Sequence, residues 1–466
     1  MKNIKILSFI ILIISLVSCT ALQRGERGVA DSGNLVIYLS SSTPPPPYIS
    51  FTISAIDVQK GDEEWLSLGD LSLSINTTDL FEKQIPVGEF YLPEGRYKRL
   101  RLRLSKAVLK RDDESFNLAI PRPAGEVILH TKFEIKRDDI VPLFMEWDAG
   151  NSVEDGYMFR PAITIRTRMT EIKHLLSYVT NTGSNSVSVI DRELGKVIGI
   201  IRVDRRPKGI TANSTGDRVY VINSRSNTIS VIDTANNEVM DTISLITGIE
   251  PTEVVLLPDD ETLYVSNFGS DDVSVVSTVS RNLITTIPVG HSPLEMATGL
   301  SGRRVYVSNS ISNTISVIDT YSNEVVNTIS GVGLRPRGML ITEDVIYVVS
   351  QGSNRISVID INSNRVIKMI SAGLNPLKLS MGLLNRIYVT SQGSDNVNII
   401  HLTSGTITGE ISVGRLPVGL SFDRDRNRLY VVNKGSDTIS VLDILSERVI
   451  ETIYVGKGPY EMVLIR

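Results

Sequence analysis

The chain has 466 residues, of which 41% are hydrophobic and 21% are charged, and its formal net charge is -4 at neutral pH. This length exceeds what one hydrophobic core usually serves, so we expect two or more domains. The composition excludes a disordered polymer, and the slightly acidic balance argues against a nucleic-acid partner, which requires a basic face.

The N-terminus has the pattern of a secretory signal peptide. Lys2 and Lys5 precede an apolar run, residues 7–17, which is shorter than the roughly 20 residues needed to span a bilayer. The run ends in the letters LVSC, which resemble the lipobox of bacterial lipoproteins. The resemblance implies that residues 1–18 are a signal peptide and that Cys19 carries lipid, which anchors the protein to a membrane outside the cytoplasm. An ordinary signal peptide with an incidental cysteine is the alternative.

Cys19 is the one cysteine of the sequence, so the mature chain has no second thiol for a disulfide, a metal site or a nucleophile. Residues 19–34 are polar and show no hydrophobic periodicity, which predicts a flexible tether. In the resembling lipoproteins an aspartate directly after the cysteine favours inner-membrane retention. Thr20 stands there, which implies an outer-membrane or outward-facing anchor in a cell with two membranes.

Residues 35–168 predict a β-sandwich domain. Runs that alternate apolar and polar residues, such as FTISAIDV and LRLRLSKAVL, are separated by turn sequences such as PEGRY. The motif order, LxEGxYxxLxLxL followed by LAIP, FEI, WDAG and FRPAI, resembles a sandwich domain of bacterial lipoproteins, domain of unknown function 4382. That resemblance implies no catalytic residues.

Residues 174–466 repeat one motif, first seen as YVTNTGSNSVSVID, at steps of 41 to 44 residues. Each copy predicts four short strands with turn residues between them, which is typical of a propeller blade. The words YVTN and SVSVID resemble the YVTN-type β-propeller repeat of archaeal surface-layer and bacterial secreted proteins. The repeats begin at seven tyrosines: Tyr178, Tyr220, Tyr264, Tyr306, Tyr347, Tyr388 and Tyr430.

The two ends of the repeat array predict how the ring closes. The first copy lacks the opening strand P-x-G-I, whereas the last copy is followed by GPYEMVLIR, which supplies one. We therefore predict that residues 459–466 form an inner strand beside residues 177–181, which removes an open sheet edge. The predicted fold class is all-β: an N-terminal β-sandwich, then a seven-bladed β-propeller closed by the C-terminal strand.

Most copies end the word SVSVID in an aspartate, and two have Ser277 or His401 instead. A residue repeated in equivalent places is expected to cap the following turn through its side-chain oxygen, not to catalyse a reaction. The aspartates are Asp191, Asp233, Asp319, Asp360 and Asp443.

The sequence contains few motifs of catalytic, metal-binding or phosphate-binding sites. No two of the four histidines lie close in sequence, and there is neither a GxSxG elbow nor a phosphate-binding glycine loop. The sequence DRDRN, residues 423–427, lacks the glycine and distal glutamate of a calcium loop, so a turn is preferred. We expect no metal and no cofactor. The two tryptophans, Trp65 and Trp147, fall in the sandwich, away from the repeats.

The loops that enter the inner strands differ between copies more than the strands do, and they should line the mouth of a central channel. Their lysines and arginines outnumber their glutamates, which suits an anionic ligand such as a cell-surface polysaccharide. Solvated loops without a ligand are the alternative. The candidate ligand-binding residues are Arg206, Lys208, Glu253, His291, Glu295, Arg337, Lys378, Tyr460 and Glu461.

Two functions follow from these patterns. The first is a monomeric, non-enzymatic binding or scaffold protein, lipid-anchored in the cell envelope, whose channel mouth meets a protein, glycan or small ligand. The second is a metal-dependent, lactonase-like hydrolase, because several seven-bladed propellers hold a divalent metal in the channel. Glu253, Glu295 and Glu461 occupy equivalent places after an opening proline, and three carboxylates around one axis could bind a metal. A redox-cofactor propeller is disfavoured because haem and quinone ligands are missing.

Overall fold

The computed structural model describes residues 32–41, 43–62, 64–112, 114–120, 125–168 and 175–465. In this part of the chain the regular structure is β, apart from one helical turn, α1 (Thr77–Leu80), and one 3-10 turn, η1 (Gln351–Ser353). Neither described helix is long and apolar enough to cross a membrane. The predicted signal peptide, Cys19 and most of the predicted tether lie outside the described residues.

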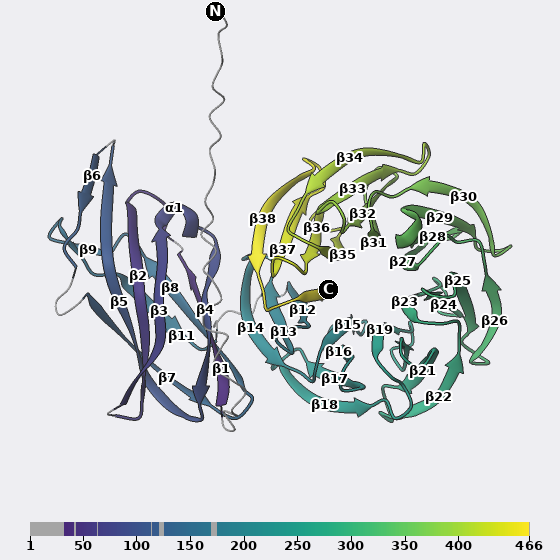
Figure 1. Ribbon diagram of the computed structural model, residues 1–466, viewed down its shortest axis with the longest axis horizontal. Coiled ribbons are helices and arrows are strands. Elements are labelled where there is room, and N and C mark those ends of the chain that lie inside the picture. The colour runs from purple at the N-terminus through teal and green to yellow at the C-terminus, as the bar shows by residue number, and fades with distance from the viewer. Residues whose placement is uncertain are drawn as a thin grey trace, which may run out of the picture.

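Two larger sheets that share one hydrophobic core, together with the two-stranded sheet β10-β9, make up the N-terminal region, which we call the two-sheet region (Figure 1). One has the order β11-β8-β1-β4, and the other has the order β3-β2-β5-β6, with β7 also paired to β5. Trp147, Phe51 and Phe159 are fully buried in the shared core. The strands of the N-terminal region are β1 (Ser32–Ser40), β2 (Tyr48–Lys60), β3 (Glu64–Asn76), β4 (Gln84–Pro93), β5 (Gly95–Arg111), β6 (Glu114–Asn117), β7 (Glu126–Ile135), β8 (Ile140–Asp148), β9 (Val153–Glu154), β10 (Met158–Phe159) and β11 (Ala162–Arg166).

Strand β1 begins at Ser32, so the prediction of a tether through residue 34 was wrong at its end. Ser32 pairs with Pro93 and Asn34 pairs with Tyr91 of β4. The Asn34 N–H also donates to the Asp139 carbonyl at 2.7 Å. These polar residues join a strand because partners on both sides satisfy their backbone groups, which a hydrophobic pattern does not reveal.

Residues 175–465 form a ring of seven four-stranded sheets (Figure 1). In each sheet the strand that opens with proline lies nearest the axis. The strands are β12 (Leu176–Asn181), β13 (Ser186–Asp191), β14 (Lys196–Arg202), β15 (Pro207–Ala212), β16 (Arg218–Asn223), β17 (Thr228–Asp233), β18 (Glu238–Ser244), β19 (Pro251–Leu256), β20 (Thr262–Asn267), β21 (Asp272–Ser277), β22 (Leu283–Pro288), β23 (Pro293–Thr298), β24 (Arg304–Asn309), β25 (Thr314–Asp319), β26 (Glu324–Ile329), β27 (Pro336–Ile341), β28 (Val345–Ser350), β29 (Arg355–Asp360), β30 (Arg365–Ser371), β31 (Pro376–Met381), β32 (Arg386–Ser391), β33 (Asn396–His401), β34 (Thr406–Ser412), β35 (Pro417–Asp423), β36 (Arg428–Asn433), β37 (Thr438–Asp443), β38 (Arg448–Tyr454) and β39 (Pro459–Leu464).

The repeated residues hold the sheets together. The buried Asn181 amide donates to the hydroxyls of Ser186 and Ser188 on the next strand, at 3.2 and 2.9 Å. In the sheet β31-β32-β33-β34 the two residue types are exchanged, because Asn398 donates to Ser391 at 2.7 Å. The asparagine of the motif is therefore a cross-strand link and not a site.

The predicted turn role of the aspartates is confirmed. Asp191 Oδ1 accepts hydrogen bonds from the backbone N–H groups of Glu193 and Leu194, at 2.8 and 3.0 Å. Ser277 and His401 cap the equivalent turns, through Ser277 Oγ at 3.1 Å and His401 Nδ1 at 3.5 Å.

The predicted pairing of the two ends of the array is also confirmed. Strand β39 lies antiparallel to β12 and completes the sheet β14-β13-β12-β39. Arg192 reinforces this closure, because its guanidinium contacts both the Asp423 carboxylate of β35 and the Ile465 carbonyl. Asp423 therefore forms an ion pair, consistent with the preference for a turn over a calcium loop at DRDRN.

The two-sheet region packs against the ring beside this closure. The Gln84 side-chain amide donates to the Val197 carbonyl and accepts from the Val197 N–H, both at 3.1 Å. It thereby imitates a neighbouring strand on the outer edge of β14. Tyr38 and Phe144, stacked with ring centroids 5.7 Å apart, join the same hydrophobic cluster as Val455 of the ring.

Candidate functional site

Seven residues form one level of the central channel: the second residue after each opening proline. Four of them are charged and three are glycine. In order around the ring they are Glu461, Gly209, Glu253, Glu295, Gly338, Lys378 and Gly419. The pairing of each inner strand with its neighbour shifts register near this residue, which indicates a bulge that re-aims the side chain.

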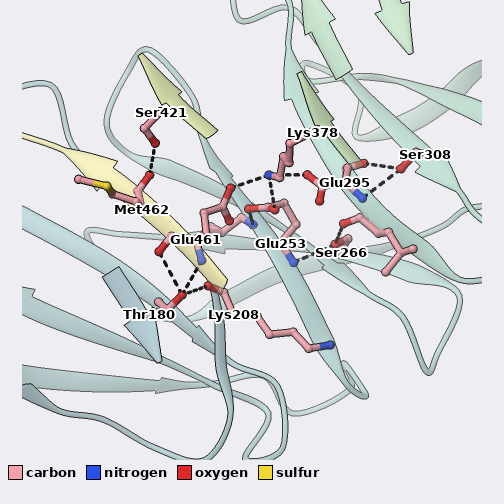
Figure 2. Close-up of polar contacts among 12 residues, drawn as sticks. Thr180, Lys208, Glu253, Ser266, Glu295, Ser308, Lys378, Ser421, Glu461 and Met462 are labelled. Carbon is pink, nitrogen blue, oxygen red and sulfur yellow. Dashed lines mark hydrogen bonds and ion pairs between the residues drawn. The ribbon is translucent and has the colours of Figure 1, made fainter. Parts of the chain in front are cut away.

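The four charged side chains meet at the axis (Figure 2). Lys378 Nζ lies 2.5 Å from Glu461 Oε1, 2.6 Å from Glu295 Oε2 and 3.2 Å from Glu253 Oε2. Their side chains retain only 5 to 17% of their exposure. We call this group the axial cluster.

The glycines at this level make room for the charged residues. A Cβ on Gly209 would lie 2.8 Å from both the Cα and Oε1 atoms of Glu253. A Cβ on Gly338 would lie 2.6 Å from the Leu377 carbonyl and 3.0 Å from the Lys378 Cα. Seven side chains would not fit in one level, so the cluster needs glycine in part of the ring.

Burial and charge oppose each other in the axial cluster. Burial lowers the pKa of Lys378, but the three carboxylates outweigh this effect and raise its pKa well above the ordinary value. Burial raises the pKa of Glu253, the negative charge of Glu461 raises it further, and Lys378 offsets part of the rise. Glu253 therefore keeps a proton at a higher pH than an ordinary glutamate does.

The three glutamates of the metal hypothesis surround a lysine. The structure does bring Glu253, Glu295 and Glu461 together, but the Lys378 ammonium lies where the carboxylates converge. Within the described residues, no group of three histidine, cysteine, aspartate or glutamate side chains is arranged to hold a metal ion. Lys378 was expected to be a free cation of the channel mouth; it is a buried partner of the three glutamates.

A signal in the sequence marks the axial cluster. Each charged residue donates its backbone N–H to a hydroxyl at the third position of the YVTN word, at 3.0 to 3.2 Å. The three sheets that carry glycine at the axial level have an aliphatic residue at that third position. The pairs are Glu461 with Thr180, Glu253 with Ser266, Glu295 with Ser308 and Lys378 with Thr390, against Gly209 with Ile222, Gly338 with Val349 and Gly419 with Val432.

A second group, which we call the mouth cations, contains Arg206, Lys208, Arg337 and Lys434. Within the described residues none of them forms an ion pair. Burial, followed by the charges of Arg206, Lys434 and Arg337, lowers the pKa of Lys208 to about 8, and the charge of Glu250 opposes part of this shift. Burial and Arg206 likewise lower the pKa of Lys434.

Two of the mouth cations contact uncharged side chains. Lys434 Nζ lies 5.7 Å from the centroid of the Tyr460 ring, and Arg337 Nε donates to Gln351 Oε1 at 3.1 Å. Burial raises the pKa of Tyr460. The sequence argument missed Lys434, because this residue stands in the turn after a YVTN word and not in a loop that enters an inner strand.

His291 does not join either group. Its Nδ1 atom contacts Asp271 Oδ2 of the neighbouring sheet at 2.7 Å, and its side chain is 73% exposed. His291 therefore contacts a neighbouring loop, and among the described residues its side chain makes no polar contact with the axial cluster or the mouth cations.

Comparisons with known proteins agree with the ring. Residues 246–381 match the family described as YNCE-like beta-propeller. A stretch of 123 residues is 30% identical to the seven-bladed beta-propeller protein Rv1057 of Mycobacterium tuberculosis, and covers 25% of this chain and 31% of that protein. The match thus spans about a third of the length of this relative.

Solved structures are similar at the level of the fold. Kuenenia stuttgartiensis hydrazine synthase is 23% identical with a TM-score of 0.50, over 55% of this chain and 88% of that one. A functionally unknown protein from Desulfotomaculum acetoxidans is 15% identical with a TM-score of 0.55, over 62% of this chain and 99% of that one. The chain is therefore a β-propeller protein, and its fold occurs both in an enzyme and in a protein of unknown function.

Proposed function

We propose that this chain is a lipid-anchored, monomeric binding protein of the cell envelope, in which a β-sandwich domain carries a seven-bladed propeller whose channel mouth binds an anionic glycan. The observation that carries the proposal is the group of mouth cations. Four cationic side chains gather at one end of the channel and form no ion pair within the described residues, although the charge of Glu250 acts on Lys208. Unpaired cations in a partly buried site favour an anion, because a ligand's charge would relieve their mutual repulsion.

The axial cluster supports binding over catalysis. Lys378 is buried among the three glutamates beneath the mouth and pairs with all of them, so its positive charge is not offered to a ligand. A hydrolase that used the three carboxylates for a metal would first have to displace a buried ammonium, and we do not propose one.

Titration calorimetry with oligogalacturonate tests the proposal, with uncharged dextran as the comparison ligand. The double variant Lys208→Gln, Lys434→Gln should bind oligogalacturonate roughly tenfold or more weakly, as expected for lost charge-assisted hydrogen bonds. Lys368→Gln, on the exposed outer strand β30, is the matched control and should bind normally. Equal binding of dextran, or unchanged affinity in the double variant, would refute the proposal.

The anchor is tested separately. Cells labelled with a fatty acid analogue should transfer the label to this chain, and Cys19→Ala should abolish labelling and release the protein from membranes. A mature protein that keeps residues 1–18 would contradict the anchor without touching the binding proposal.

A further inference from the structure

A cavity of about 370 Å³ lies between the two-sheet region and the ring. Its wall is largely apolar and includes Val36, Ile140, Ile200 and Tyr454. Apolar cavities of this size at the junction of two folded regions are a common form of small-molecule site.

Two of these wall residues break the repeat pattern. Ile200 of β14 stands where four other outer strands have threonine: Thr242, Thr286, Thr328 and Thr452. Tyr454 of β38 stands where three other outer strands have serine: Ser244, Ser371 and Ser412. Ile200 and Tyr454 thus add apolar surface where β14 and β38 face the two-sheet region, and a cavity remains between the two surfaces there.

The cavity also contains a polar atom without a partner. Tyr38 lines it and is only 2% exposed, and its ring is fixed by stacking on Phe144. Its hydroxyl makes no hydrogen bond to any described residue. This hydroxyl is not among the fully buried, unpartnered polar atoms of the described residues, so it can be reached from the cavity and a ligand could hydrogen-bond to it.

A second, polar cavity of about 220 Å³ adjoins the first, and the two share Glu89, Ser184 and Lys457. Its charges are of both signs and four of them are paired: Lys457 with Glu89 at 2.6 Å, and Arg202 with Asp138 at 3.7 Å. The remaining carboxylate, Asp139, accepts the Ile140 N–H at 3.0 Å through Oδ1. Such a surface offers hydrogen bonds but little net charge, so it suits an uncharged group rich in hydroxyls.

We propose that the two adjoining cavities form one site for an uncharged amphiphile, with an aliphatic body against Ile200 and Tyr38 and a polyhydroxyl head beside Glu89 and Lys457. The site is separate from the channel mouth, and this proposal does not depend on glycan binding there. Because it is built from both regions, its ligand would bridge the two-sheet region and the ring.

Titration of the full chain with octyl glucoside, kept below the concentration at which micelles form, tests this site. We expect saturable binding of octyl glucoside, no measurable binding of glucose, and weaker binding of octyl sulfate, because the sulfate meets the carboxylates of Glu89 and Asp138. Binding of octyl sulfate equal to or stronger than that of octyl glucoside would refute the assignment of an uncharged head.

Two variants locate the binding. Ile200→Trp fills the apolar cavity and should weaken octyl glucoside binding at least roughly tenfold, through steric exclusion. Met369→Trp is its control, because Met369 is the equivalent residue of β30, away from the two-sheet region.

Tyr38→Phe keeps the stacked ring and removes only the hydroxyl, so this variant should fold normally and bind roughly two- to tenfold more weakly. Equal loss in Met369→Trp, or full affinity in both Ile200→Trp and Tyr38→Phe, would place the amphiphile elsewhere and overturn the proposal.

Discussion

Two junctions of the ring are built differently. Between the sheets β19-β22 and β23-β26, Tyr264 donates to Asn323 at 2.5 Å and Ser266 donates to the Leu294 carbonyl at 2.7 Å. The hydrophobic cluster at this ordinary junction contains ring residues alone. At the closure junction, between the sheet completed by β39 and the sheet β35-β38, a buried ion pair and the two-sheet region are added.

The difference follows from chain connectivity. An inner strand at an ordinary junction is continuous with the rest of its own sheet, whereas β39 pairs with β12 from the far end of the repeat array. Pairing distant segments costs loop-closure entropy, and chain ends fray unless they are held. Stabilising contacts are therefore concentrated at the closure junction, and variants there should have larger effects than variants elsewhere.

The largest expected effect comes from removing residues 459–466. This deletion exposes the edge of β12 and removes the apolar side chains of Met462, Val463 and Leu464 from their clusters. Loss of three such side chains should lower the free energy of unfolding by more than about 4 kcal/mol. Thermal unfolding followed by circular dichroism measures it, and a melting temperature equal to that of the intact chain would contradict the role of β39.

Arg192→Met should have the next largest effect. It leaves the Asp423 carboxylate buried and unpaired and frees the Ile465 carbonyl, so we expect a loss of about 3 to 5 kcal/mol. Arg303→Met is the matched control, because Arg303 pairs with Asp319 from a 73% exposed side chain and should contribute at most about 1 kcal/mol. Equal losses in urea unfolding would show that the closure junction is not special.

Glu253→Gln tests how pH acts on the axial cluster, which joins β39 to ordinary inner strands through Lys378. Because the pKa of Glu253 is raised in the folded chain, the folded state binds its proton more tightly than the unfolded state does. Its contribution to stability is present at acid pH and is lost as the pH rises from the ordinary glutamate pKa through the raised one.

Glu253→Gln has no titrating group at this position, so it lacks the pH dependence of stability that Glu253 causes. The stability of Glu253→Gln relative to the natural chain should therefore rise with pH in that window, by up to about 1.4 kcal/mol per pH unit. Urea unfolding at several pH values measures the difference, and a constant difference would contradict the raised pKa. Glu324→Gln, on the exposed start of β26, should show no such trend.

Gln84→Ala should have the smallest effect. It removes two hydrogen bonds to Val197 at the outer edge of β14, which predicts a loss of about 1 to 2 kcal/mol. If the two-sheet region steadies the closure, proteolysis should then begin at β14 sooner than at β22. Unchanged cleavage at β14 would show that the amide bonds do not hold this edge.

Much of the fold could be predicted because the repeated motif depends on residues that are close together in the sequence. The tyrosine spacing, the capping aspartates and the extra opening strand at Pro459 each depend on a few neighbouring residues. The predicted pairing of this strand, β39, with β12 is present in the structure. The axial cluster was only half predicted. Glu253, Glu295 and Glu461 were placed in one register, but Lys378 has the opposite charge and was assigned to the mouth, although Thr390 marks its register as well.

By itself the sequence determined the repeat, the strands and the way the two ends meet, because hydrophobic periodicity and turn residues act over short distances. Only the tertiary structure decided which side chains face one another across the axis and where the two-sheet region lies. Lys378 meets Glu461 across 83 positions of sequence, and Gln84 meets Val197 across 113. No local pattern encodes these meetings, because they arise from the curvature of the closed ring and from the packing of one region against another.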